Sequence, residues 1–261
     1  AVALHDCDIL TYDRNLLARL VYPVANPKFN FDFCKGYYPR VSQGKIKGRV
    51  ARLLVTPLLR ALEKTIGHNE FISFVDSFRY PLAGEFSFRR RVLKDIRIPY
   101  DWGLEIGVLS EMFRNYASNR VCQADIASNY DHKHQDISFN DNSTGLSKMS
   151  VDITKVLIRK LASQGEMFSM SIFRSLKATY YREALDFVQI YKKDAMMNSF
   201  DIDVHEEETA VELFAKNIMT AGQIFLESPM ESPNIPTWNR IDTALPSFLS
   251  DLKNAVINDN S

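Results

Sequence analysis

The chain has 261 residues, of which 46% are hydrophobic and 25% are charged, proportions that are ordinary for a soluble globular protein. Its 32 basic and 32 acidic side chains cancel, which argues against bulk electrostatic attraction to nucleic acid or to an anionic membrane. No apolar run reaches the roughly 18 residues of a membrane span, and three scattered cysteines without a CxxC pair indicate a reducing, cytoplasmic setting and no structural zinc.

The first half of the chain mixes short strands with helices. In chain order, the spacing of apolar residues predicts a strand over 1–4, a helix over 15–24, a strand over 29–38, helices over 50–66, 69–78, 86–96 and 103–116, and a strand over 120–127. Pro57 is a candidate kink or break in the helix over 50–66. Because strands alternate with helices, the pattern favours an α/β layer architecture.

After about residue 140 the pattern becomes almost entirely helical. The linker-like stretch DISFNDNSTG precedes predicted helices over 148–163, 171–196, 206–226 and 246–257, with a proline-rich loop at 228–238. We therefore divide the chain into an α/β domain at 1–140 and a helical region at 141–261. Amphipathic helices need partner surfaces, so we expect this region to pack on the first domain or to form a homodimer contact.

Two aspartates, Asp6 and Asp8, follow the first predicted strand. Open α/β sheets bind ligands outside the carboxyl ends of their strands, and carboxylate oxygens suit Mg²⁺ or Mn²⁺ ions that bridge substrate phosphates. Leu10 occupies the position where an aspartyl-phosphate enzyme of the DxDx[TV] type has Thr or Val, so nothing supports that mechanism. A surface loop with two solvated carboxylates is the alternative interpretation.

Two further polar stretches are candidate binding loops. In GKIKGRVARL, at 44–53, helix N-terminal amides and the Arg49 guanidinium would form an anion site. In NYDHKHQD, at 129–136, His132 and His134 would point to opposite sides of an extended segment, so only one could readily bind a given metal ion. Ordinary solvated loops are the alternative for both stretches.

Two glutamates stand beside apolar residues, where a carboxylate needs a reason to be. Glu85 lies in YPLAGE and Glu105 lies in YDWGLEIG. Gly84 and Gly103 in these motifs permit close approach of the backbone. Trp102 is either a stacking surface for a ligand or a core residue, and each motif taken alone is explained by a core or a turn.

The order of these motifs resembles that of the glucosyl-3-phosphoglycerate synthases, which are retaining glycosyltransferases with a GT-A, Rossmann-like fold. The resemblance covers about residues 1–140 and is most specific in GRVARLLVTPLL, PLAGEF and DWGLEIGVL. It implies a metal-dependent hexosyltransferase that moves glucose from a nucleotide diphosphate sugar, usually UDP-glucose, to 3-phosphoglycerate.

The resemblance also implies a role for each residue of the motifs. Asp8 would bind the Mg²⁺ or Mn²⁺ ion, and His132 would be its second protein ligand. The donor side would comprise Asp6, Asp8, Trp102, Glu105 and His134, with Asp8 and Glu105 in the catalytic positions. The acceptor loop would comprise Gly48, Arg49, Val50 and Ala51. Because a histidine must be neutral to bind metal, we expect metal binding to weaken below roughly pH 6.

Departures from the family pattern leave alternatives open. The family commonly has Thr at the position of Ala51 and Tyr at that of Trp102, and its histidine loop aligns only after a one-residue shift, so His132 and His134 could exchange roles. Mannose instead of glucose, and glycerate instead of phosphoglycerate, therefore stay open. The alternative functions are nucleotidyl transfer or hydrolysis of a nucleotide sugar at the same metal, and a non-catalytic helical scaffold or binding module.

The chain begins without Met, inside a predicted strand. A GT-A domain builds its nucleotide site from strands that precede the DxD motif. We therefore expect residues 1–140 to be the C-terminal half of such a domain, with the N-terminal part absent.

Overall fold

The computed structural model describes residues 1–128, 130–131, 145–231 and 234–260. Within these ranges a sheet of four strands has the order β1-β5-β2-β7, which are Val2–Leu4, Phe86–Phe88, Phe33–Tyr37 and Val121–Asp125. Strand β5 runs antiparallel to β1 and to β2, whereas β2 and β7 run parallel. Strands β1, β2 and β7 therefore point the same way and end at the same edge of the sheet.

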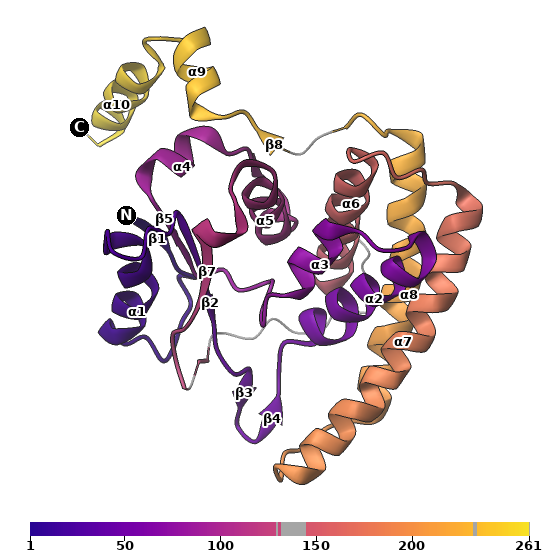
Figure 1. Ribbon diagram of the computed structural model, residues 1–261. Coiled ribbons are helices and arrows are strands. Elements are labelled where there is room, and N and C mark those ends of the chain that lie inside the picture. The colour runs from indigo at the N-terminus through magenta and orange to yellow at the C-terminus, as the bar shows by residue number, and fades with distance from the viewer. Residues whose placement is uncertain (129, 132–144, 232–233, 261) are drawn as a thin grey trace.

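Helices cover both faces of this sheet (Figure 1). Helix α1 (Arg14–Ala25) buries an apolar stripe against one face, and Asp13 caps it by accepting a hydrogen bond from the Asn15 N–H at 2.9 Å. The opposite face carries Phe33, Phe86 and Phe88 into the large hydrophobic core. The first-half helices that share this core are α2 (Thr56–Ile66), α3 (Glu70–Asp76), α4 (Arg90–Asp95) and α5 (Leu104–Asn115).

Three long helices form most of the second half. Helices α7 (Met170–Met197) and α8 (Val204–Glu227) lie side by side at the right of Figure 1, and α6 (Gly145–Ala162) packs against α8. Their apolar stripes join the core of the first half, where Tyr180 donates a hydrogen bond to the Leu53 carbonyl at 2.6 Å. The core is therefore continuous across residue 140, and the boundary between two domains there stays a prediction.

The predicted helix over 50–66 is present but begins in an unusual form. Residues Val50–Val55 form a π-helix, η1, and the α-helical pattern of α2 starts at Thr56. Pro57 lies in the first turn of α2, where its missing N–H removes no α-helical hydrogen bond, so it marks the change of helix type and does not break the element. Single π-turns are frequent at functional sites.

The predicted helix over 86–96 is wrong in its first residues. Phe86–Phe88 form strand β5, and only Arg90–Asp95 are helical. All three residues of β5 are buried because the strand lies between β1 and β2 with both faces covered. Two phenylalanines that suit a core helix equally suit a central strand, so short apolar runs do not separate the two structures.

Several short elements complete the fold. Strands β3 (Val41–Ser42) and β4 (Lys45–Ile46) form a hairpin, with Gln43 and Gly44 at positive φ in its turn. The bounds of the remaining short elements are β6 Ile98–Pro99, η2 Ser118–Arg120, β8 Asn234–Ile235, α9 Trp238–Ala244 and α10 Phe248–Asp259. Helix α9 lies mostly beyond the predicted proline-rich loop and was not predicted.

The predicted class, an α/β region followed by a largely helical C-terminal region, is confirmed. Among the helices that the structure describes, none combines the length and the apolar character that crossing a bilayer requires.

Candidate functional site

The carboxyl ends of three parallel strands bring the predicted motifs together. Asp6 follows β1, Tyr38 follows β2 and Tyr130 follows β7 in the chain, while Glu85 directly precedes the antiparallel β5. Sequence spacing predicted this edge for Asp6 and Asp8 alone. The topology adds Glu85 and the two tyrosines to it because β5 enters the sheet where its neighbours leave it.

Glu85 is the buried centre of this edge, with 0% of its surface exposed. Tyr38 donates a hydrogen bond to its Oε2 at 2.6 Å, Tyr130 donates one to its Oε1, and the Asp6 N–H lies 3.4 Å from Oε1. The Tyr38 and Tyr130 rings stack with centroids 3.6 Å apart. Burial beside the Glu85 charge raises the pKa of both tyrosines, so they remain hydrogen-bond donors. One carboxylate thus joins the loops after β1, β2 and β7.

The loop after β1 and the loop after β7 are also joined directly. The Leu10 N–H donates a hydrogen bond to the Asp131 carbonyl at 2.8 Å, and the Asp131 N–H donates one to Thr11 Oγ1 at 2.9 Å. Asp8 lies in this loop, between the contacts of Asp6 and Leu10, and is exposed. Asp131 is the residue immediately before His132.

The predicted metal ligand His132 and its alternative His134 lie outside the described residues. Within the part of the chain that is described, no three His, Cys, Asp or Glu side chains gather in a way that could hold a metal ion. The pairing of Asp8 with a histidine therefore stays a prediction. The nearest described residue is Asp131, which precedes His132 and is hydrogen-bonded to the loop that carries Asp8.

Lys35 in β2 is a buried cation beneath the same edge. Its Nζ donates a hydrogen bond to the Ala83 carbonyl at 2.5 Å, and only 1% of the residue is exposed. Burial lowers the pKa of Lys35 to about 8, although the charges of Glu105, Glu85 and Asp6 oppose the shift. Burial likewise raises the pKa of Glu105, against the attraction of Lys35. Carboxylates from three separate motifs thus act electrostatically on one ammonium group.

The pKa of Lys35 makes stability depend on pH in a defined window. The folded protein releases the proton near pH 8, whereas the unfolded chain keeps it up to about pH 10.5, so the unfolded state binds more protons between these values. We expect the free energy of unfolding of the wild type, minus that of Lys35→Met, to rise by up to about 3 kcal/mol over this window. Urea denaturation at several pH values measures it, and a flat difference would contradict it.

Trp102 precedes α5 by two residues, and Glu105 lies in its first turn. Trp102 is 41% exposed, so it is not a core residue. Gly103 is buried where Val156 of α6 packs against the backbone so closely that a Cβ would collide with it. The helical region therefore fixes the position at which α5 presents Trp102 and Glu105.

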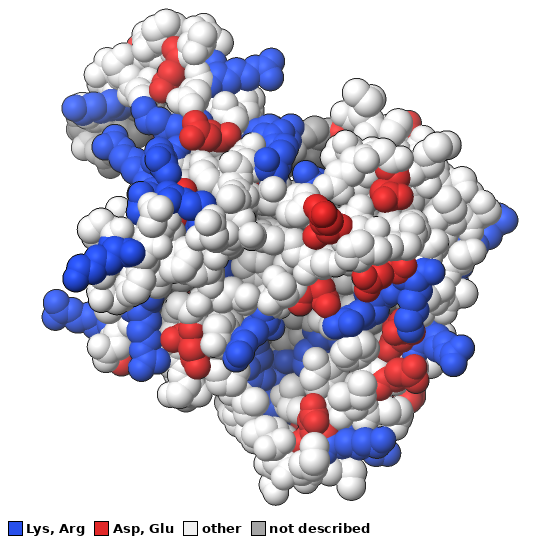
Figure 2. Space-filling view, in the orientation of Figure 1, with Lys and Arg blue, Asp and Glu red and all other residues white. Residues whose placement is uncertain are grey.

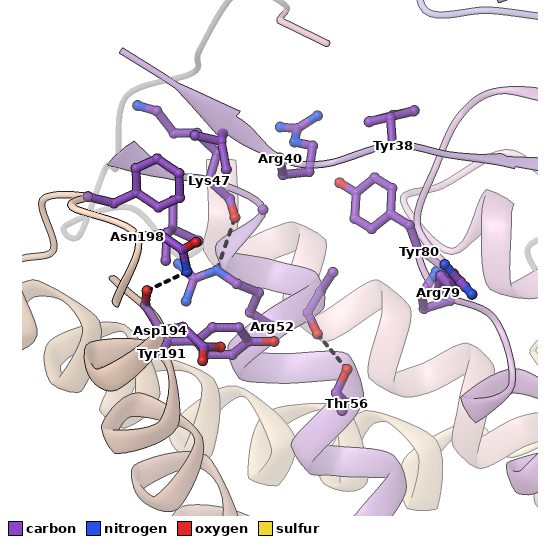
Figure 3. Close-up of a pocket in the computed structure, with 16 residues that line it drawn as sticks. Tyr38, Arg40, Lys47, Arg52, Thr56, Arg79, Tyr80, Tyr191, Asp194 and Asn198 are labelled. Carbon is purple, nitrogen blue, oxygen red and sulfur yellow. Dashed lines mark hydrogen bonds between the residues drawn. The ribbon is translucent and has the colours of Figure 1, made fainter. Parts of the chain in front are cut away.

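A pocket of about 250 Å³ lies next to this edge, between the β3–β4 hairpin, η1 and the C-terminal end of α7 (Figure 3). Four of its lining residues are cationic, namely Arg40, Lys47, Arg52 and Arg79, and Asp194 is acidic. Figure 2 shows basic side chains around a hollow in the lower half of this face. The pocket therefore suits a small anionic ligand.

The predicted acceptor loop divides between the pocket and the core. Gly48 and Ala51 line the pocket, and Gly48 takes a positive φ of 74° that glycine adopts without strain. Val50 is buried in the core. Arg49 does not line the pocket, because its guanidinium pairs with Glu207 at 2.9 Å and with Glu206 at 3.2 Å.

Sequence reasoning missed most of the pocket. Arg40 and Arg79 lie 5.7 and 4.9 Å from the ring centroids of Tyr80 and Tyr37, respectively, and neither was singled out. Arginine beside an aromatic residue in the chain, as in Arg79-Tyr80, is a weak signal that could have marked one of them. Tyr38 both lines the pocket and binds Glu85, so the pocket and the strand edge form one continuous site.

Comparison with known proteins finds relatives along the whole chain. It is 45% identical over 261 residues to a glucosyl-3-phosphoglycerate synthase of Persephonella marina, all of this chain and 64% of that protein. It is 38% identical over 262 residues to one of Methanococcoides burtonii, 99% of this chain and again 64% of the relative. The chain thus spans less than two thirds of the length of these relatives.

A weaker likeness links the chain to a solved structure. The glucosyl-3-phosphoglycerate synthase of Mycobacterium tuberculosis, crystallised with Mn²⁺, UDP-glucose and phosphoglyceric acid, is 23% identical with a TM-score of 0.46, over 64% of this chain and 50% of that one. No protein-family model matches the chain.

Proposed function

The chain is a homologue of the glucosyl-3-phosphoglycerate synthases along its whole length, whereas its motifs predicted the resemblance over about residues 1–140, and on this premise we propose that it carries the metal, donor and acceptor sites of such an enzyme. The enzyme would have a GT-A core and would transfer glucose from UDP-glucose to the hydroxyl group of 3-phosphoglycerate. The observation that carries the proposal is the cationic pocket of about 250 Å³, which shares Tyr38 with an edge of buried and exposed carboxylates.

The strand edge supplies, in Asp8, the kind of oxygen ligand that a divalent cation prefers. Asp8 is an exposed carboxylate, and Asp131, next to the histidine loop, is hydrogen-bonded to the loop of Asp8. Asp8 and His132 would hold Mg²⁺ or Mn²⁺, with His134 as the alternative ligand. When bound, the ion neutralises the charge that develops on the leaving diphosphate.

The protein's own side chains would hold the two substrates. The cations of the pocket orient an acceptor that carries a phosphate and a carboxylate, which converts a bimolecular encounter into a held geometry. Glu105 would accept hydrogen bonds from the sugar hydroxyls beside Trp102, and Asp6 would face the ribose. Glu85 holds the loops after β2 and β7 in fixed positions relative to each other, because Tyr38 and Tyr130 both donate hydrogen bonds to it.

The reaction would retain the configuration at the anomeric carbon. The acceptor oxygen bonds to the anomeric carbon while the bond between that carbon and the diphosphate breaks. A phosphate oxygen of the donor takes the proton of the acceptor hydroxyl. A proton NMR spectrum of the product tests this step, because an α-linked glucoside from α-linked UDP-glucose means retention. An inhibitor-trapped glycosyl adduct on any carboxylate of the protein would overturn the front-face route.

One assay separates this function from its alternatives. Protein expressed from the complete gene is incubated with Mn²⁺ and UDP-glucose, with and without 3-phosphoglycerate, and UDP and sugar products are quantified. We expect UDP release and glucosyl-3-phosphoglycerate only when the acceptor is present. UDP-glucose cleavage without acceptor would indicate a hydrolase. Turnover with GDP-mannose but not UDP-glucose, or with glycerate but not 3-phosphoglycerate, would change the assignment of the donor or the acceptor. No cleavage under any condition, and no thermal shift with UDP and Mn²⁺, would favour the binding module.

Two further sequence predictions belong with this proposal. We expect a homodimer, which light scattering tests, and a cytoplasmic location, which fractionation of the host cells tests. Neither is needed for the chemistry of the site.

A further inference from the structure

We propose that Arg52 is a further binding residue for an anionic group of the acceptor, and that Glu207 of the helical region is the residue that positions it. The inference rests on the proposed function and extends its acceptor site to two residues that the predicted acceptor loop does not include. It also gives the helical region a part in substrate binding.

Arg52 is placed in the wall of the pocket with little freedom to move. It is 8% exposed, and its Nε donates a hydrogen bond to the Lys47 carbonyl at 3.0 Å. Its guanidinium lies over the Tyr191 ring of α7, with 4.6 Å from Cζ to the ring centroid (Figure 3). Its Nη1 lies 2.8 Å from Glu207 Oε2. For Nη2 the described part of the chain shows no hydrogen bond or ion pair, so this nitrogen is the donor left for a ligand.

Glu207 is a buried carboxylate with two cationic partners. It is 3% exposed in the first turn of α8, and its Oε1 accepts a hydrogen bond from Arg49 Nε at 2.9 Å while its Oε2 faces Arg52. One side chain therefore holds two arginines, Arg49 directly before η1 and Arg52 within it. Arg49 is turned towards α8, where Glu206 also pairs with it, whereas Arg52 stays at the pocket.

The charges favour an anion in the pocket that Arg52 lines. Glu206 and Glu207 together balance Arg49 and Arg52, which leaves Arg40, Lys47 and Arg79 in excess over Asp194 at the pocket. A rigid arginine loses little side-chain entropy on binding, and its planar donors match a carboxylate or a phosphate. The connection between α7 and α8 also holds the hairpin wall, since the Asp201 N–H donates a hydrogen bond to the Gly44 carbonyl at 2.8 Å.

The test is the variant Glu207→Gln, with Glu206→Gln as its matched control. The two glutamates are adjacent on α8, and both touch Arg49, but Glu207 alone touches Arg52. In Glu207→Gln we expect the KM for 3-phosphoglycerate to rise about tenfold. This rise corresponds to the loss of one charge-assisted hydrogen bond between Arg52 and the acceptor, because Arg52 is no longer held in place. We expect the KM for UDP-glucose to stay within about twofold, and both constants to stay within about twofold in the control.

Each result decides the inference. A folded Glu207→Gln protein with an unchanged acceptor KM, or with equal changes for donor and acceptor, would overturn it, because a purely structural carboxylate would not act on the acceptor alone. If that variant does not fold, Tyr191→Leu removes the ring under Arg52 and should raise the acceptor KM in the same sense, and an unchanged value would overturn the inference. A wild type without transfer to any anionic acceptor would instead refute the proposed function.

Discussion

Replacing Asp8 by asparagine is expected to lower kcat/KM for UDP-glucose at least about 100-fold, because the variant loses one negative ligand of an ion that supplies several kcal/mol of transition-state stabilisation. Asparagine keeps the shape of the side chain and one oxygen but not its charge. The apparent Mn²⁺ requirement should rise in parallel, and titrating Mn²⁺ at fixed UDP-glucose and 3-phosphoglycerate measures both effects.

Asp13→Asn is the matched control for this prediction. Asp13 is an exposed aspartate five residues further on, and its carboxylate caps α1 through the Asn15 N–H. Asparagine is as good an N-cap as aspartate, so the rate and the Mn²⁺ requirement should stay within about twofold of the wild type. An Asp8→Asn enzyme that matched the wild type in both quantities would remove Asp8 from the metal site.

Glu85→Ala is expected to lower the free energy of unfolding by about 3–5 kcal/mol, the cost of breaking a buried charged hydrogen-bond network. The variant leaves the buried hydroxyls of Tyr38 and Tyr130 without their acceptor and removes a negative charge beside the buried ammonium of Lys35. Urea denaturation followed by circular dichroism measures the loss.

Two companions calibrate this result. Tyr130→Phe removes a single donor and should cost about 1 kcal/mol. Glu212→Ala changes an exposed glutamate on α8 and should alter stability by less than about 0.5 kcal/mol. If Glu85→Ala were as mild as Glu212→Ala, Glu85 would not be the centre that joins the loops of the strand edge.

The sequence predicted the place of those candidate site residues whose position depends only on the strand or helix next to them in the chain. Asp6 and Asp8 follow β1, and Gly48 and Ala51 line the pocket. The position of a carboxylate after a strand, or of a glycine before a helix, is set by the neighbouring residues of the chain. Arg49 was chosen by the same local reasoning but pairs with α8, since nothing near it in the chain indicates two glutamates more than 150 residues away.

By itself, the sequence determined the long helices and the α/β order of the first half, because the periods of 3.6 and 2 residues record which faces are buried. Only the tertiary structure decided that Phe86–Phe88 form a central strand, that Glu85 joins three loops, and that Glu207 and Tyr191 both contact Arg52 of the pocket. The physical reason is that hydrophobic periodicity is a property of neighbouring residues, whereas a contact between distant side chains depends on how whole elements pack.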